Sequence, residues 1–268
     1  MPDLYADVQR NGTTAVVLLH GQPGTGGDWD WVAPLVEDRY TLVVPDRPGY
    51  GRTGGSATGF AGNAGAVVAL LDRLEVHRAV LVGHSWAGGI GLAAAVAHPD
   101  RVSGLVLVSS VGPGDPIGWA DRLLALPLLG EVAAATTIGG VGLILGRRRV
   151  QDLASRRLDG WAKDAVTSLT RLTRGGSGTW RSFVAEQRAL LSELPALAGR
   201  LGSIDVPTAV LHGRNDHLVP VSVAEHLSAA IAGATLTVLP RAGHLLPHDR
   251  PEAVAVAIHD VAARTGTA

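Results

Sequence analysis

The chain contains no cysteine and carries almost no net charge. Without cysteine among its 268 residues, it has no disulfides, no thiolate metal ligands and no cysteine nucleophile. A formal net charge of −1 gives no indication of binding to nucleic acid or to an anionic membrane surface. The histidines lack the spacing of a metal motif such as His-Glu-x-x-His, so no metal ion and no other cofactor is expected.

Segments that would direct the chain into or across a membrane are also scarce. The N-terminal residues 1–7 have no basic region and no apolar stretch, so no secretory signal is expected. Residues 123–145 are apolar over roughly the length of a membrane span, but Pro127 and Glu131 interrupt them. We interpret this segment as buried or pocket-lining helices and predict a soluble, cytoplasmic protein.

The chain does contain enough apolar residues for a large core, since 46% are hydrophobic and only 18% are charged. Short β-rich runs alternate with helical segments, and uninterrupted apolar runs are typical of strands covered on both faces. This alternation predicts a mostly parallel sheet flanked by helices. The expected strands are residues 14–19, 40–44, 79–84, 102–108, 208–213 and 234–239, and the expected helices are residues 60–76, 86–97, 223–231 and 253–263.

The alternation stops after residue 110 and resumes after residue 201. The intervening residues form helical segments separated by proline and glycine, without a strand-like run. We therefore predict a helical cap, residues 111–201, inserted into an α/β core made of residues 1–110 and 202–268. Trp119, Trp161 and Trp180 are candidates for the lining of a substrate pocket under the cap, and each fits a position in the cap's own core equally well.

Ser85 lies between small residues where an apolar run meets a helical segment. The surrounding sequence departs from the Gly-x-Ser-x-Gly pattern only at Ala87, which replaces the second glycine. A serine in this pattern occupies a tight turn at the start of a helix, where backbone N–H groups and the helix dipole favour negative charge. A simple strand-to-helix connection with an N-capping serine would explain the same residues. Ser85 is thus a candidate nucleophile that needs partners elsewhere in the chain.

A nucleophilic serine needs a base to take its proton and an acid to orient that base. His244 follows the last expected strand and should lie at the same sheet edge as Ser85. Asp216 follows the preceding strand, although it could instead cap the next helix. Asp205 would lie at the opposite edge, and Asp249 comes after His244 in the chain. The sequence therefore predicts a triad of Ser85, Asp216 and His244.

Two backbone N–H groups are expected to form an oxyanion hole for this triad. One belongs to Trp86, directly after the nucleophile, and the other to Gln22, in the loop after the first long strand. Pro23 has no N–H to donate, and its ring fixes the turn that exposes the preceding N–H. Residues 46–51 are expected to brace this turn without taking part in the chemistry.

Five motifs, in the order in which they follow one another along the chain, resemble those of the α/β-hydrolase fold family. Within that family, the chain most resembles the capped esterase, non-haem haloperoxidase-like and carbon–carbon hydrolase branches. Trp86, directly after the candidate nucleophile, resembles the residue at that position in haloalkane dehalogenases and epoxide hydrolases. Those enzymes use an aspartate as the nucleophile, so Ser85 excludes their chemistry. The motifs are His20-Gly21-Gln22-Pro23-Gly24, Asp46-Arg47-Pro48-Gly49-Tyr50-Gly51, Gly83-His84-Ser85-Trp86-Ala87-Gly88, Gly213-Arg214-Asn215-Asp216 and Gly243-His244.

The resemblance implies an α/β-hydrolase fold, and with the triad it predicts a serine hydrolase that cleaves an ester-like carbonyl bond of a small, largely apolar molecule. Two alternatives stay open. The same residues could cleave a carbon–carbon bond of a ketone or diketone, with residues 147–149 or Arg181 holding a carboxylate. A non-hydrolytic cyclase or isomerase of natural-product chemistry, or a ligand-binding protein, could also use this fold. The sequence does not indicate an oligomeric state.

Overall fold

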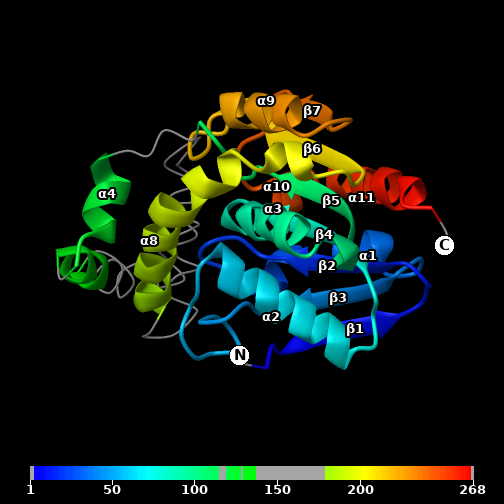
Figure 1. Ribbon diagram of the computed structural model, residues 1–268, viewed down its shortest axis with the longest axis horizontal. Coiled ribbons are helices and arrows are strands. Elements are labelled where there is room, and N and C mark those ends of the chain that lie inside the picture. Colours follow the sequence, from blue (N-terminus) through cyan, green and yellow to red (C-terminus); the bar gives the residue numbers. More distant parts are fainter. Residues whose placement is uncertain (1–2, 115–118, 128, 137–178, 267–268) are drawn as a thin grey trace, which may run out of the picture.

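The computed structural model describes residues 3–114, 119–127, 129–136 and 179–266 (Figure 1). In this part of the chain, one seven-stranded sheet has the order β1-β3-β2-β4-β5-β6-β7. All neighbouring strands are parallel except β1, which pairs antiparallel with β3. The strands are β1 (Ala6–Arg10), β2 (Ala15–Leu19), β3 (Thr41–Pro45), β4 (Ala79–His84), β5 (Val102–Val108), β6 (Thr208–Gly213) and β7 (Thr235–Leu239).

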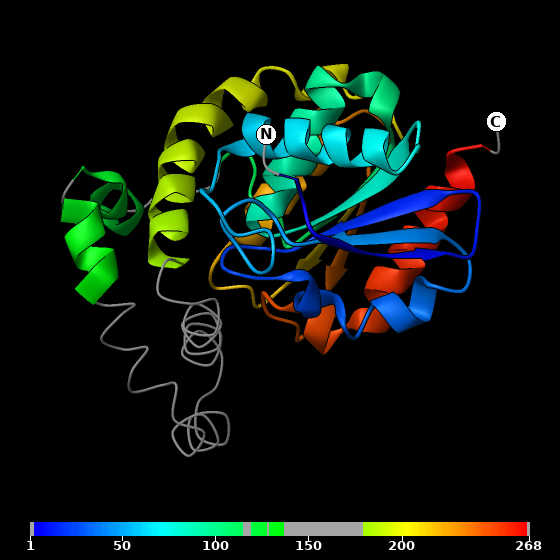
Figure 2. The same cartoon turned by 90° about the horizontal axis from the view of Figure 1, so that it is seen from below.

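Helices cover both faces of the sheet, as Figure 2 shows for α2 and α3 on one side and α1 and α11 on the other. The α-helices are α1 (Ala33–Val36), α2 (Phe60–Arg73), α3 (Trp86–Ala97), α4 (Trp119–Ala125), α8 (Thr179–Ala198), α9 (Val221–Ala230), α10 (Leu246–Asp249) and α11 (Pro251–Arg264), and the short 3-10 helices are η1 (Gly26–Trp29), η2 (Pro99–Arg101) and η3 (Leu201–Ser203).

The central strands are mostly apolar because both of their faces are buried. Successive side chains of a strand point to opposite faces, so Val17 joins the core cluster beside α2 and α3 while Val16 joins the cluster beside α1 and α11. Glycines bring α3 close to its neighbours. A Cβ atom at Gly89 would lie 2.5 Å from the Phe60 ring of α2. The sequence therefore specifies a sheet between two helical layers and a tightly packed helix behind Ser85.

The six strands and four helices expected from the sequence are all present, with ends that differ by at most a few residues. Strand β1 was not predicted from the sequence; it lies at the edge of the sheet and is mostly exposed. An edge strand of this kind has no continuous apolar run, so the pattern used to find the other strands does not detect it.

Between β5 and β6, every described secondary-structure element is a helix: α4, residues 129–136, α8 and η3. Figure 1 shows α8 between α4 and the sheet, and its Leu190 and Leu194 side chains belong to the main core cluster. The division into a core and a cap stays a prediction, because residues 137–178 lie outside the described part.

The apolar segment 123–145 was expected to form buried or pocket-lining helices, and its described part is not buried throughout; a pocket-lining role stays a prediction. Within its described part, Leu129 is 60% exposed and Val132 is 62% exposed. Among the described residues, this helical layer packs on α8, where Leu124 and Ala134 lie beside Val184. Among the described helices, none is long and apolar enough to cross a membrane.

Candidate active site

Ser85 occupies a strained turn between β4 and α3. Its φ angle of 55° lies in the left-handed region, which costs a residue with a side chain about 1–3 kcal/mol. The turn is so tight that a Cβ atom at Gly83 would lie only 2.5 Å from the carbonyl oxygen of Ala87. The small residues around the serine are therefore required by the backbone, and they leave Ser85 8% exposed at the end of the sheet.

His244 and Asp216 reach Ser85 from the loops that follow β7 and β6. The Nε2 atom of His244 lies 2.9 Å from Ser85 Oγ, and its Nδ1 atom lies 2.8 Å from Asp216 Oδ2. The other carboxylate oxygen of Asp216 accepts hydrogen bonds from the backbone N–H groups of Leu218 and Val219, both at 2.9 Å. The structure thus brings together all three residues of the predicted triad, in a chain of hydrogen bonds.

The surroundings of Asp216 favour its charged form. Burial raises the pKa of Asp216, but the hydrogen bond and charge of His244 and the backbone N–H of Val219 outweigh it, so this pKa lies below its ordinary value. An ionised Asp216 accepts the Nδ1–H of His244, so Nε2 is the ring nitrogen that faces Ser85 and can accept the serine proton.

His212, which the sequence analysis did not single out, also lies against this carboxylate. Its Nε2 atom is 3.3 Å from Asp216 Oδ2 and 2.8 Å from the carbonyl oxygen of Val219. Burial lowers the pKa of His212, which favours the neutral ring. Its position in the sequence could have indicated this contact, because His212 lies near the end of a buried strand, immediately before the loop that contains Asp216.

Trp86 and the loop that contains Gln22 both adjoin the serine. Trp86 is the first residue of α3, so its backbone N–H has no acceptor within the helix. The loop containing Gln22 passes directly beside the nucleophile, because a Cβ atom at Gly21 would lie 3.2 Å from Ser85 Cβ. The side chain of Gln22 is turned to α8, where its Nε2 donates to the carbonyl oxygen of Phe183 at 2.8 Å.

Residues 46–51 brace this loop, as the sequence analysis expected. The buried Arg47 side chain donates from Nε to the carbonyl oxygen of His20 at 2.8 Å and from Nη2 to that of Gly21 at 2.9 Å. The backbone N–H of Arg47 also donates to His20 Nε2 at 3.0 Å. Two consecutive carbonyl groups are therefore fixed by one guanidinium group.

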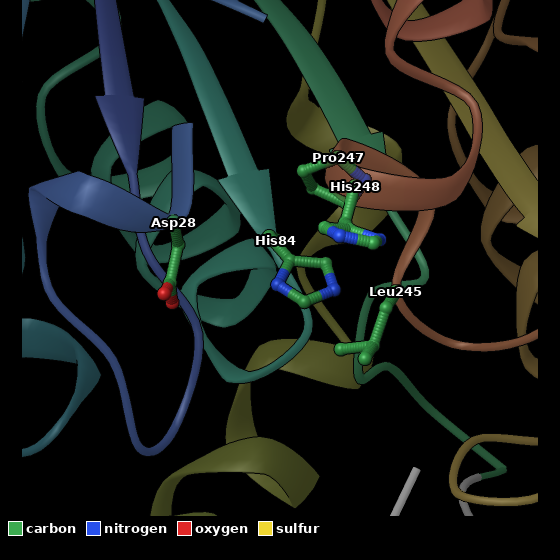
Figure 3. A pocket seen from close by; sticks show the side chains of 5 residues that line it. All are labelled: Asp28, His84, Leu245, Pro247 and His248. Carbon is green, nitrogen blue, oxygen red and sulfur yellow. The ribbon is translucent and has the colours of Figure 1, made fainter. Parts of the chain in front are cut away.

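A small hollow lies beside the loop that carries His244 (Figure 3). The side chain of His84, from the end of β4, stands between Asp28 and the residues that follow His244. Its Nε2 donates to the backbone carbonyl of His244 at 3.0 Å and so ties this loop to the sheet. Among the described residues, no group of three or more histidine, aspartate or glutamate side chains could hold a metal ion.

The predicted pocket residues of the cap are only partly described. Trp180 lies on α8, half-buried beside Val184, with the guanidinium group of Arg181 5.0 Å from its ring. Trp119 is the first residue of α4, and Trp161 and residues 147–149 lie outside the described part. Contact of these tryptophans with a substrate stays a prediction.

Comparisons with known proteins agree with this architecture. A model of the family described as "Alpha/beta hydrolase family" matches residues 16–257. A 2-hydroxy-6-oxononadienedioate/2-hydroxy-6-oxononatrienedioate hydrolase of Cupriavidus pinatubonensis is 30% identical, over 87% of this chain and 81% of that protein. An esterase of Exiguobacterium antarcticum superposes with a TM-score of 0.72 at 25% identity, over 97% of this chain and 95% of that one.

A longer relative is the dihydrolipoyllysine-residue acetyltransferase component of the acetoin cleaving system of Cupriavidus necator. It is 32% identical over 87% of this chain, and the match spans 59% of its own length. Similarity to this protein therefore concerns only part of it.

Proposed function

The chain belongs to the alpha/beta hydrolase family, and from this membership and the geometry of Ser85 we propose that it is a serine hydrolase. It cleaves an ester-like carbonyl bond of a small, largely apolar substrate through an acyl-enzyme. The observation that carries this proposal is the pair of contacts made by His244, at 2.9 Å to Ser85 Oγ and at 2.8 Å to Asp216 Oδ2. A nucleophile, a base and an acid that orients the base are thus joined by consecutive hydrogen bonds.

In the first half of the reaction, Ser85 Oγ attacks the substrate carbonyl carbon while His244 Nε2 takes the hydroxyl proton. The carbonyl oxygen becomes an oxyanion, which accepts hydrogen bonds from the backbone N–H groups of Gln22 and Trp86. His244 then passes the proton to the leaving alcohol, and the acyl group stays on Ser85. Asp216 holds the ring in the required tautomer and stabilises its cationic form.

In the second half, His244 takes a proton from water, which attacks the acyl carbon. The same two N–H groups hold the second oxyanion. Its collapse returns the proton to Ser85 and releases the acid. Only side chains, backbone groups and water take part, so the proposal includes no cofactor, and the expected partner is a small molecule in a cytoplasmic setting.

A labelling experiment tests this proposal. A fluorophosphonate probe forms a bond from its phosphorus atom to an activated serine oxygen and loses fluoride, and intact-mass spectrometry counts the adducts. We expect one adduct on the wild-type chain, none on Ser85→Ala, and wild-type labelling of Ser192→Ala, in which an exposed serine of α8 is removed. A wild-type protein that takes up no probe would instead support a non-hydrolytic function.

Carbon–carbon bond hydrolysis is the second candidate, favoured by the 30% identity to the Cupriavidus pinatubonensis hydrolase. That reaction would need a cation for the substrate's carboxylate. Arg181 is exposed on α8 and available for this role. Turnover of p-nitrophenyl esters compared with turnover of vinylogous diketones separates the two candidates, since a diketone hydrolase should prefer the second substrate and lose that preference in Arg181→Ala.

A further inference from the structure

A buried ion pair connects α8 to the loop beside the nucleophile. The guanidinium group of Arg47 contacts the carboxylate of Glu186, and their side chains are 1% and 0% exposed. The hydroxyl of Tyr50 donates to Glu186 Oε2 at 2.6 Å, and the Trp86 indole donates to the backbone carbonyl of Glu186 at 3.2 Å. Burying a charged pair costs about as much free energy as it returns. Stability of the fold is therefore a weak explanation for this arrangement.

Arg47 also binds the peptide group between Gly21 and Gln22. Its Nη2 donates to the carbonyl oxygen of Gly21 at 2.9 Å. That carbonyl belongs to the same peptide unit as the N–H of Gln22. A trans peptide is planar, so its C=O and N–H point in opposite directions. This carbonyl also accepts from His20 Nδ1 at 2.9 Å, so Arg47 and the His20 ring together fix the direction of the Gln22 N–H.

This peptide needs external support. Gly21 has no side chain that would restrict rotation about its own backbone dihedrals. The neighbouring carbonyl of His20 is held by Arg47 as well, through Nε at 2.8 Å. Both contacts come from a guanidinium group whose carboxylate partner, within the described part of the chain, is Glu186.

We propose that Glu186 is a positioning residue of the oxyanion hole: it orients Arg47, which holds the Gly21 carbonyl and thereby aims the Gln22 N–H at the oxyanion. This inference rests on the proposed serine-hydrolase function. It also couples the Glu186 turn of α8 to the oxyanion hole, because a shift of the helix at Glu186 would reach the donor through Arg47. The bond from Gln22 Nε2 to the Phe183 carbonyl joins the same helix to the same loop a second time.

Two substitutions test the proposed link from Glu186 through Arg47 to the Gly21 carbonyl, one at each of the two side chains. Glu186→Gln keeps the shape of the side chain but removes its charge. Arg47→Lys keeps a positive charge opposite Glu186 but has no fork to hold two carbonyl groups. The matched control is Glu193→Gln, on the same helix, where the carboxylate accepts from the backbone N–H of Ala61 at 3.0 Å and supports α2.

Loss of one oxyanion donor costs about 10²- to 10³-fold in kcat. We expect Arg47→Lys to approach that loss and Glu186→Gln to lose at least about 10-fold, with KM for a p-nitrophenyl ester nearly unchanged. Glu193→Gln should keep the wild-type kcat. Because both substitutions act through one carbonyl, the double variant should lose little more than Arg47→Lys alone.

Several outcomes would overturn the positioning role. A folded Glu186→Gln protein with wild-type kcat, or a double variant whose losses multiply, contradicts it. If Glu186→Gln does not fold, Glu186→Asp keeps the charge but draws the carboxylate away from Arg47, and an unchanged kcat in that variant is equally decisive. A wild-type chain that hydrolyses no ester and takes up no probe rejects the proposed function itself, whereas an active wild type with unaffected variants rejects only the role of Glu186.

Discussion

The imidazole of His244 lies 2.9 Å from the hydroxyl of Ser85, although 159 positions separate them in the chain. A parallel sheet brings them together, because β4 and β7 end at the same edge and each residue follows its strand. Asp216 follows β6, the strand beside β7, and completes the connection. The active-site geometry is thus a consequence of the sheet order.

Asp216→Asn should lower kcat by about 10⁴-fold, because an amide can donate to Nδ1 and so stabilise the wrong tautomer of His244. Steady-state ester hydrolysis measures this loss. The control is Asp205→Asn, which changes an exposed aspartate in the segment before β6, at the opposite edge of the sheet. Equal activities of the two variants would show that Asp216 does not orient the base.

From the lowered pKa of Asp216, we also predict that the folded protein becomes less stable in acid. Its pKa in the folded protein lies below the value of about 3.9 expected in the unfolded chain. Ionised Asp216 therefore stabilises the fold above about pH 4, and this contribution is lost as the pH falls through the folded-state value. The difference in the free energy of unfolding between wild type and Asp216→Asn, measured with urea, should shrink from pH 6 to pH 3. A constant difference would contradict the shift.

Gly21→Ala should disturb the oxyanion loop without unfolding the protein. The new Cβ atom would lie 3.0 Å from His84 Nδ1 and 3.2 Å from Ser85 Cβ, so the loop must move by a few tenths of an ångström. Small misplacements of catalytic groups cost up to about 10²-fold in rate. We expect a lower kcat at a similar melting temperature. The control, Gly199→Ala, places a methyl group where no atom lies within 4 Å and should keep full activity.

The triad positions could be predicted because each depends on a local pattern. Ser85 is marked by the small residues that its turn requires, and Asp216 and His244 each follow an apolar strand. Parallel strands place such residues at one edge without any knowledge of detailed packing. The contribution of Arg47 to the loop was likewise suggested by the turn residues around it.

The partner of Arg47 could not be predicted in the same way. Glu186 lies 139 positions away, on a helix with many charged and polar residues. Glutamate is rarely buried completely, and nothing in the helical pattern singles out this one. Its role depends on how α8 packs against the core, which is a property of the tertiary structure.

The central claim is that Ser85 attacks the substrate and that His244 serves it as a base. It is tested most directly by kcat for a p-nitrophenyl ester in Ser85→Ala, His244→Ala and the double variant. We predict a loss of about 10⁴-fold or more in each single variant and almost no further loss in the double variant, since both residues act in one step. A Ser85→Ala protein that retains near wild-type turnover would contradict the account.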